Sequence, residues 1–210
     1  MPMSIRIGQN LTIDKGFSGT TYNFSGAISC AETVTATMKP DVTGQVYNFS
    51  GSLENFKGTL SLNSNITANF NNVGTVGAKS ISLAGPTTIA GTFSTSGSLT
   101  STGTLTNNGN LTISGSYTGR TITQSDDASL ILSTGAIVNL DSMTNTSPTL
   151  NASDTTGVQT WSGSWTLATG GTVTAENGVI YQYKGKSTTG GSVSGGVISA
   201  NGNYFNGDFQ

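Results

Sequence analysis

Residues 81–116 read ISLAGP TTIAGT FSTSGS LTSTGT LTNNGN LTISGS when they are divided every six residues. Glycine stands at the fifth place of every unit, from Gly85 to Gly115, and Ser or Thr stands at every second place. Successive side chains of a β-strand point to opposite faces, so the first, third and fifth places share one face. A six-residue unit cannot bury its own apolar side chain, but stacked copies can. The block therefore predicts short stacked strands around a narrow continuous core.

A second repeat precedes this block. The phrase YNFSG occupies residues 22–26 and returns at residues 47–51. The offset from Tyr22 to Tyr47 corresponds either to one coil of a solenoid or to one strand-turn-strand pair. Alternating apolar and polar residues at 33–38 and 59–70 predict half-buried strands, and no window has helical spacing. We therefore expect an all-β protein.

Composition divides the 210 residues into three predicted segments. Residues 1–74 form an N-terminal β region, for attachment or the first coils, and residues 75–154 form the hexad shaft. Residues 155–210 are aromatic and rich in turns. Asn-Gly is a strong signal for a tight hairpin turn, so we expect hairpins in this last segment. The Asn-Gly dipeptides are at 177–178, 201–202 and 206–207.

Charge and composition exclude several classes of partner. The net charge is −2, only 9% of residues are charged, and there is no basic run, so we expect no nucleic-acid partner. No apolar stretch is long enough to span a bilayer, and residues 1–10 contain no apolar segment of a secretory signal. The single cysteine, Cys30, allows no internal disulfide and is expected to be a small buried apolar residue.

The residue types needed for common catalysis are scarce. The chain has no histidine, which removes the usual general base and the commonest metal ligand. Asp126 and Asp127 are the closest pair of carboxylates, but neighbours on a strand point to opposite faces, so they are not expected to act together on a glycosidic bond. We therefore predict no enzyme activity, no cofactor and no metal site.

Four aromatic residues near the C-terminus form the sharpest candidate binding site. Trp161 and Trp165 are four residues apart, and Tyr181 and Tyr183 are two apart, so each pair shares one face if it lies on a strand. Such rings could stack on the sugars of a host receptor. Large aromatic residues are also favoured in cores and subunit contacts, and that alternative stays open.

The hexads resemble known repeat families. The pattern Leu-Thr-x-x-Gly-x looks like the hexapeptide repeat of left-handed β-helices, although Gly stands where that family prefers Ser, Thr, Ala or Val. The phrase LTNNGNL at 105–111 is similar to the repeats of filamentous-haemagglutinin-type adhesins. The richness in Gly, Ser, Thr and Asn, with short β repeats and an aromatic terminal segment, resembles bacteriophage tail fibres and other virion appendages. These resemblances assign no functional residue.

Together these features predict a β-solenoid or an intertwined trimeric β-fibre. A homotrimer is favoured because a narrow core of small residues buries little apolar area. The expected function is a structural virion appendage, such as a tail or head fibre or a decoration component, that attaches to the host surface. Its expected partners are other virion proteins and a host-surface glycan.

Three alternatives remain for the function. The first is a β-solenoid adhesin at a bacterial surface, and the second is a polysaccharide depolymerase. The third is an ice-binding protein with a regular Thr array. The array is not expected, because the fourth place of the hexads varies, from Ala84 to Asn108.

Overall fold

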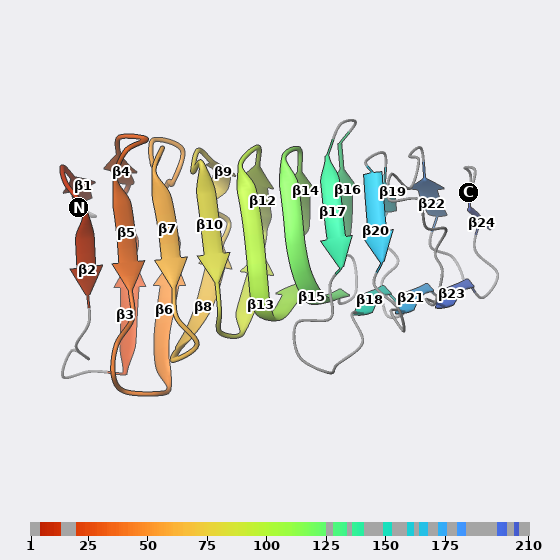
Figure 1. Ribbon diagram of the computed structural model, residues 1–210, viewed down its shortest axis with the longest axis horizontal. Helices are drawn as coiled ribbons and strands as arrows, with labels where there is room; N and C mark the ends of the chain where they lie inside the picture. Colours follow the sequence, from red (N-terminus) through yellow and green to blue (C-terminus); the bar gives the residue numbers. More distant parts are fainter. Residues whose placement is uncertain are drawn as a thin grey trace.

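The computed structural model describes residues 5–13, 20–124, 128–133 and 136–140, and beyond these the strands between 149 and 205 by their backbone. Every described element is a β-strand, and every described strand pair is parallel. The strands stack as a β-solenoid whose first strands, β1 and β2, and last strands, β23 and β24, lie at opposite ends of the long axis (Figure 1). The all-β prediction is confirmed. Of the two architectures expected, the chain adopts the solenoid.

The strands form three faces, and the strands from β7 to β22 occupy them in a fixed cyclic order along the chain. Face A contains β2 (Leu11–Ile13), β5 (Thr35–Met38), β7 (Thr59–Leu62), β10 (Ser80–Leu83), the first parts of β13 (Ser98–Asn107) and β15 (Ser116–Gln124), β17 (Ile137–Leu140) and β20 (Ser164–Leu167). Face B contains β3 (Thr21–Phe24), β6 (Gln45–Phe49), β8 (Ile66–Asn71), β11 (Thr87–Ala90), the second parts of β13 and β15, β18 (Thr149–Ala152), β21 (Thr172–Ala175) and β23 (Val197–Ala200). Face C contains β1 (Ile5–Ile7), β4 (Ile28–Cys30), β9 (Gly74–Val76), β12 (Thr92–Thr95), β14 (Asn110–Ile113), β16 (Ser129–Leu132), β19 (Gln159–Trp161), β22 (Ile180–Tyr183) and β24 (Tyr204–Phe205).

Three hexads make one coil. Ile81 on face A pairs with Leu99, and Phe93 on face C pairs with Leu111, so each residue lies beside its counterpart three hexads later. The predicted alternation is confirmed, because Leu99 and Leu111 are fully buried whereas Thr100 and the other second-place residues are half-exposed. The even length of the hexad keeps the same places pointing inward on all three faces.

The coils preceding the hexads are longer. Tyr22 pairs with Tyr47, and Tyr47 pairs with Ala68, so each of these two coils contains more residues than three hexads supply. The repeat of YNFSG is therefore one coil of the solenoid rather than a strand-turn-strand pair. Part of the extra length lies in an exposed segment, residues 41–44, between β5 and β6.

The core changes its chemistry along one column of face B. Phe24 stacks on Phe49 and Phe49 on Phe70, each with ring centroids 4.9 Å apart and planes 12° apart. The next positions in register are Ile89 and Asn107, where the coil contains fewer residues. Stacked rings fill this column in the longer coils, and smaller side chains replace them in the shorter ones.

Asn107 brings a polar side chain into this core and satisfies it. Its Nδ2 donates to Gln124 Oε1 at 3.1 Å and to the Ser129 carbonyl at 2.9 Å, and its Oδ1 accepts from the Gly109 amide at 3.1 Å. A buried amide is tolerated where its donors and its acceptor are paired. Asn107 therefore ties face B to the start of face C.

A second amide ladder runs on the outside of face B. Asn48 Nδ2 donates to Asn23 Oδ1 and Asn69 Nδ2 donates to Asn48 Oδ1, each at 2.8 Å. Identical side chains in register can bond along the stacking axis in this way. The ladder reinforces the alignment of the longer coils.

Backbone contact between coils explains the hexad glycines. A Cβ on Gly103 would lie 2.3 Å from the Gly85 carbonyl oxygen, and one on Gly109 would lie 2.2 Å from the Gly91 carbonyl oxygen. Each hexad glycine that makes such a contact stands where a coil turns a corner against the coil before it. A side chain there would push two hydrogen-bonded coils apart.

The structure also bears on the C-terminal segment. Strands β21 and β22 pair in parallel with strands of the neighbouring coils, so these pairs do not form the predicted hairpins, which require antiparallel strands. The Asn-Gly dipeptides themselves lie outside the described residues. The division into segments 1–74, 75–154 and 155–210 stays a prediction.

Gly103→Ala tests the corner contact. We expect it to lower the free energy of unfolding by about 1–3 kcal/mol, because the new methyl group overpacks two backbones that cannot separate. Gly8→Ala is the matched control and should be nearly neutral, since a Cβ on Gly8 has nothing within 4 Å. Urea unfolding followed by circular dichroism measures both variants. Equal stability of the two variants would contradict the close-contact explanation.

Candidate functional site

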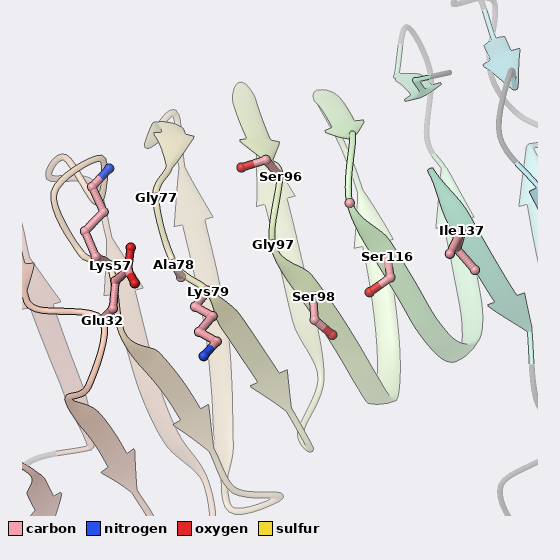
Figure 2. A pocket seen from close by; sticks show the side chains of 11 residues that line it. Glu32, Lys57, Gly77, Ala78, Lys79, Ser96, Gly97, Ser98, Ser116 and Ile137 are labelled. Atoms are coloured by element: carbon pink, nitrogen blue, oxygen red, sulfur yellow. The ribbon is translucent and has the colours of Figure 1, made fainter. Parts of the chain in front are cut away.

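A shallow groove of about 630 Å³ follows the edge at which face C turns into face A. It crosses successive coils, so its length runs along the solenoid axis (Figure 2). Its walls come from the segments that connect β9 to β10, β12 to β13 and β14 to β15. Residues distant in sequence are therefore brought into one site by the stacking of coils.

Glycine forms the floor of this groove. A Cβ would lie 2.0 Å from the Glu54 carbonyl oxygen at Gly77, 2.1 Å from that of Ala78 at Gly97, and 2.3 Å from that of Gly97 at Gly115. The same close packing that requires glycine also leaves the edge without side chains. The floor is low because the coils are in backbone contact.

The backbone of the floor is used by the solenoid itself. The Ser98 amide donates to the Lys79 carbonyl at 3.0 Å, and the Ser116 amide donates to the Gly97 carbonyl at 3.2 Å. The Ile137 amide donates to the Gly115 carbonyl at 3.0 Å. A ligand in the groove would thus meet side chains rather than the donors and acceptors of a free strand edge.

Three serines supply hydroxyl groups. Ser98 and Ser116 are half-exposed and stand one coil apart in register, and Ser96 is exposed. Within the described part of the chain, none of these three hydroxyls has a hydrogen-bond partner. Each can donate to one ligand atom and accept from another.

One end of the groove carries charge. Lys57, Lys79 and Glu32 line it, and the Lys57 and Lys79 side chains extend in opposite directions (Figure 2). Lys57 Nζ reaches over Gly77, where it would lie 2.8 Å from a Cβ. These three groups sum to one positive charge in a chain whose net charge is −2. The groove is a local exception to the acidic balance of the chain.

The other end is apolar. Ile137 lines the groove at the start of β17 and is 55% exposed. It takes the position in register that Ser116 and Ser98 occupy in the preceding coils. The site therefore passes from cations, through hydroxyls, to one exposed aliphatic side chain.

The predicted aromatic site is placed only by its backbone. Trp161, Trp165, Tyr181 and Tyr183 lie in β19, β20 and β22, and their side chains lie outside the described residues. Trp161 is in register with Tyr183 and with Leu132. Receptor contact by these residues stays a prediction.

Trp165 has a register position that can be compared with described residues. It pairs with Val138, which pairs with Tyr117, and Tyr117 pairs with Leu99. Tyr117 and Leu99 are both fully buried. The Trp165 side chain lies outside the described residues, so receptor contact and a core position both stay predictions.

Other candidate chemistry is limited. Asp126 and Asp127 lie outside the described residues. The described residues contain no group of His, Cys, Asp and Glu that could hold a metal ion. Among them there is also no helix long and apolar enough to cross a membrane. Cys30 is buried and unpaired, which confirms its predicted role in the core.

Sequence reasoning missed the arrangement of outward residues on face A. The sequence prediction considered the second and fourth places within one hexad. On face A, the outward residues of each strand come instead from the sixth place of one hexad and the second place of the next. They are Ser80 and Ser82 on β10, Ser98 and Thr100 on β13, and Ser116 and Thr118 on β15. They form two columns of hydroxyls beside the groove. Comparison of residues three hexads apart was the signal that could have located them.

The chain was compared with protein-family models, with curated proteins and with solved structures, and none of the three comparisons found a match.

Two buried tyrosines, Tyr47 and Tyr117, have raised pKa values. Neither the Tyr47 nor the Tyr117 hydroxyl has a hydrogen-bond partner in the described residues. Burial raises the pKa of Tyr117 far above its ordinary value of 10.0, and nearby Ser101, whose own hydroxyl donates to the Gly103 carbonyl, opposes the rise. Burial, and then the neighbouring Tyr22, raises the pKa of Tyr47. The folded chain thus favours both tyrosines as neutral phenols.

We expect stability to fall at alkaline pH. A raised pKa in the folded state leaves stability intact below the unfolded value, about 10, and reduces it as the pH rises further, because the unfolded chain ionises first. The loss reaches up to about 1.4 kcal/mol per pH unit for each buried tyrosine. Urea midpoints measured from pH 8 upward test this. Tyr117→Phe should give a shallower decline, and an unchanged decline would contradict the assignment.

Proposed function

We propose that this chain is a structural shaft segment of a virion appendage, such as a tail or head fibre or a decoration component. The observation that carries the proposal is the in-register stacking of parallel coils along one axis, with aromatic and aliphatic columns inside. Parallel ladders with a close-packed core resist bending. Such a rod would hold a binding end at a fixed distance from its base.

The outer faces suit a shaft exposed to solvent. Ser, Thr and Asn dominate the outward places, and few charges interrupt them. Hydroxyl and amide side chains remain hydrated without strong attraction to a single partner. We propose that copies assemble as a homotrimer and that weak contacts with the host surface gain avidity from the number of copies.

The alternative is a β-solenoid adhesin at a bacterial surface. It would use the same rod for the same mechanical purpose, so the fold is compatible with both. The two proposals differ in where the protein is assembled. The location of the protein therefore separates the two proposals.

Small-angle X-ray scattering with light-scattering mass tests the shaft. Coils spaced about 4.8 Å apart, with roughly 18–25 residues in each, predict a rod of about 40–55 Å for one chain. A globular profile would overturn the shaft. A mass of three times 21.4 kDa is the expected result, and a mass of 21.4 kDa would withdraw the trimer alone.

Immunogold electron microscopy tests the location. Antibodies raised against the purified chain should label appendages or the surface of virus particles. Label on the bacterial envelope would transfer the proposal to the adhesin alternative. Label confined to the cell interior, with none on particles or on the envelope, would contradict both proposals.

A further inference from the structure

We propose that the groove between faces C and A binds an extended acidic polysaccharide, with carboxylates at Lys57 and Lys79 and hydroxyls at Ser98 and Ser116. The geometry of the groove carries this proposal. Only the source of the polymer, a host surface, rests on the proposed function.

The shape of the groove favours a linear polymer. Ser98 and Ser116 are neighbours in register, so their hydroxyls recur at the spacing of parallel strands, about 4.8 Å along the axis. The groove is shallow and crosses several coils (Figure 2). A compact molecule would contact one coil, whereas an extended chain meets equivalent groups in each coil that it crosses.

The charge of the groove favours an acidic polymer. Lys57 and Lys79 outnumber Glu32 among the lining residues, whereas Arg6 and Lys39 are not among them. An exposed ammonium group contributes modestly to each contact with a carboxylate. Repeated weak contacts along one polymer add to useful affinity.

The backbone disfavours a peptide. A peptide that adds a strand needs free backbone donors and acceptors at an edge. At this edge the Lys79, Gly97 and Gly115 carbonyls already accept amides of the following coil. Among the described residues the Ser96, Ser98 and Ser116 hydroxyls have no partner, and hydroxyls pair well with the hydroxyls of sugars.

The apolar end fits the same ligand class. Ile137 offers an exposed aliphatic surface beside Ser116. A sugar ring presents C–H groups on its faces and hydroxyls at its edges. One residue of the polymer can therefore place a ring face on Ile137 while its neighbour bonds to Ser116.

The test measures binding of fluorescent polygalacturonate, alginate and hyaluronate to the full chain. Each polymer is compared with its methyl ester, which keeps the chain and removes the negative charge. We expect binding to at least one free acid, weaker binding to its ester, and weakening with salt. Lys79→Ala should raise the Kd about two- to fivefold, and Lys39→Ala, outside the groove, should leave it unchanged.

A second pair of variants tests the groove by filling it. Ser96→Tyr places a ring in the groove and should abolish binding, whereas Ser64→Tyr, on an exposed turn elsewhere, should not. Circular dichroism confirms that each variant is folded. The binding proposal is overturned if none of the three acids binds, or if acid and ester bind equally. It is also overturned if each groove variant changes the Kd no more than its control variant does. If the same preparation still scatters as a rod, the proposed shaft function is kept and only polysaccharide binding in the groove is withdrawn.

Discussion

The close approach of successive backbones at the solenoid corners is the constraint on which the rest of the structure depends. Parallel hydrogen bonds hold adjacent coils about 4.8 Å apart, and at the corners a carbonyl oxygen fills the space that a Cβ would need. Gly97 over Ala78 and Gly103 over Gly85 show this contact directly. Glycine at every sixth residue then sets the length of each side, and the even spacing keeps the apolar places inside. A single local requirement thus fixes the length of each side, the alternation and the core places together.

Coil length in turn determines what the core can contain. In a longer coil, as from Tyr22 to Tyr47, stacked phenyl rings fill one column of the interior. In the coils of three hexads, leucine and isoleucine are buried together with Phe93, and Asn107 is accommodated because its donors and acceptor are all paired. The burial of the Tyr117 hydroxyl without a partner marks the place where the hexad pattern ends. The chain remains one continuous stack through these changes because register, not side-chain type, connects the coils.

The same constraint produces the candidate binding surface. Glycine leaves one edge without side chains, and the serines beside it repeat with the coils. A protein with so few charged residues still presents two lysines at one end of that edge. Rigidity and recognition are therefore not separate properties of this rod. The stacking that stiffens the shaft also repeats weakly binding groups along its length, which is the arrangement that a polymeric ligand can use.

The sequence by itself determined the all-β class, the inward and outward places of each hexad, and the offset between the two YNFSG phrases, because strand alternation and in-register repetition are local properties of the chain. It did not determine how many hexads close one coil, and so it could not tell that Ser98 lies beside Ser116 or that Lys79 shares a groove with Ile137. It also left Trp165 open between receptor contact and core, and the structure adds only its backbone register with Val138. Those relations depend on closure around three faces. Only the tertiary structure decides them, because neighbours across coils are set by the length of a full turn rather than by any short stretch of residues.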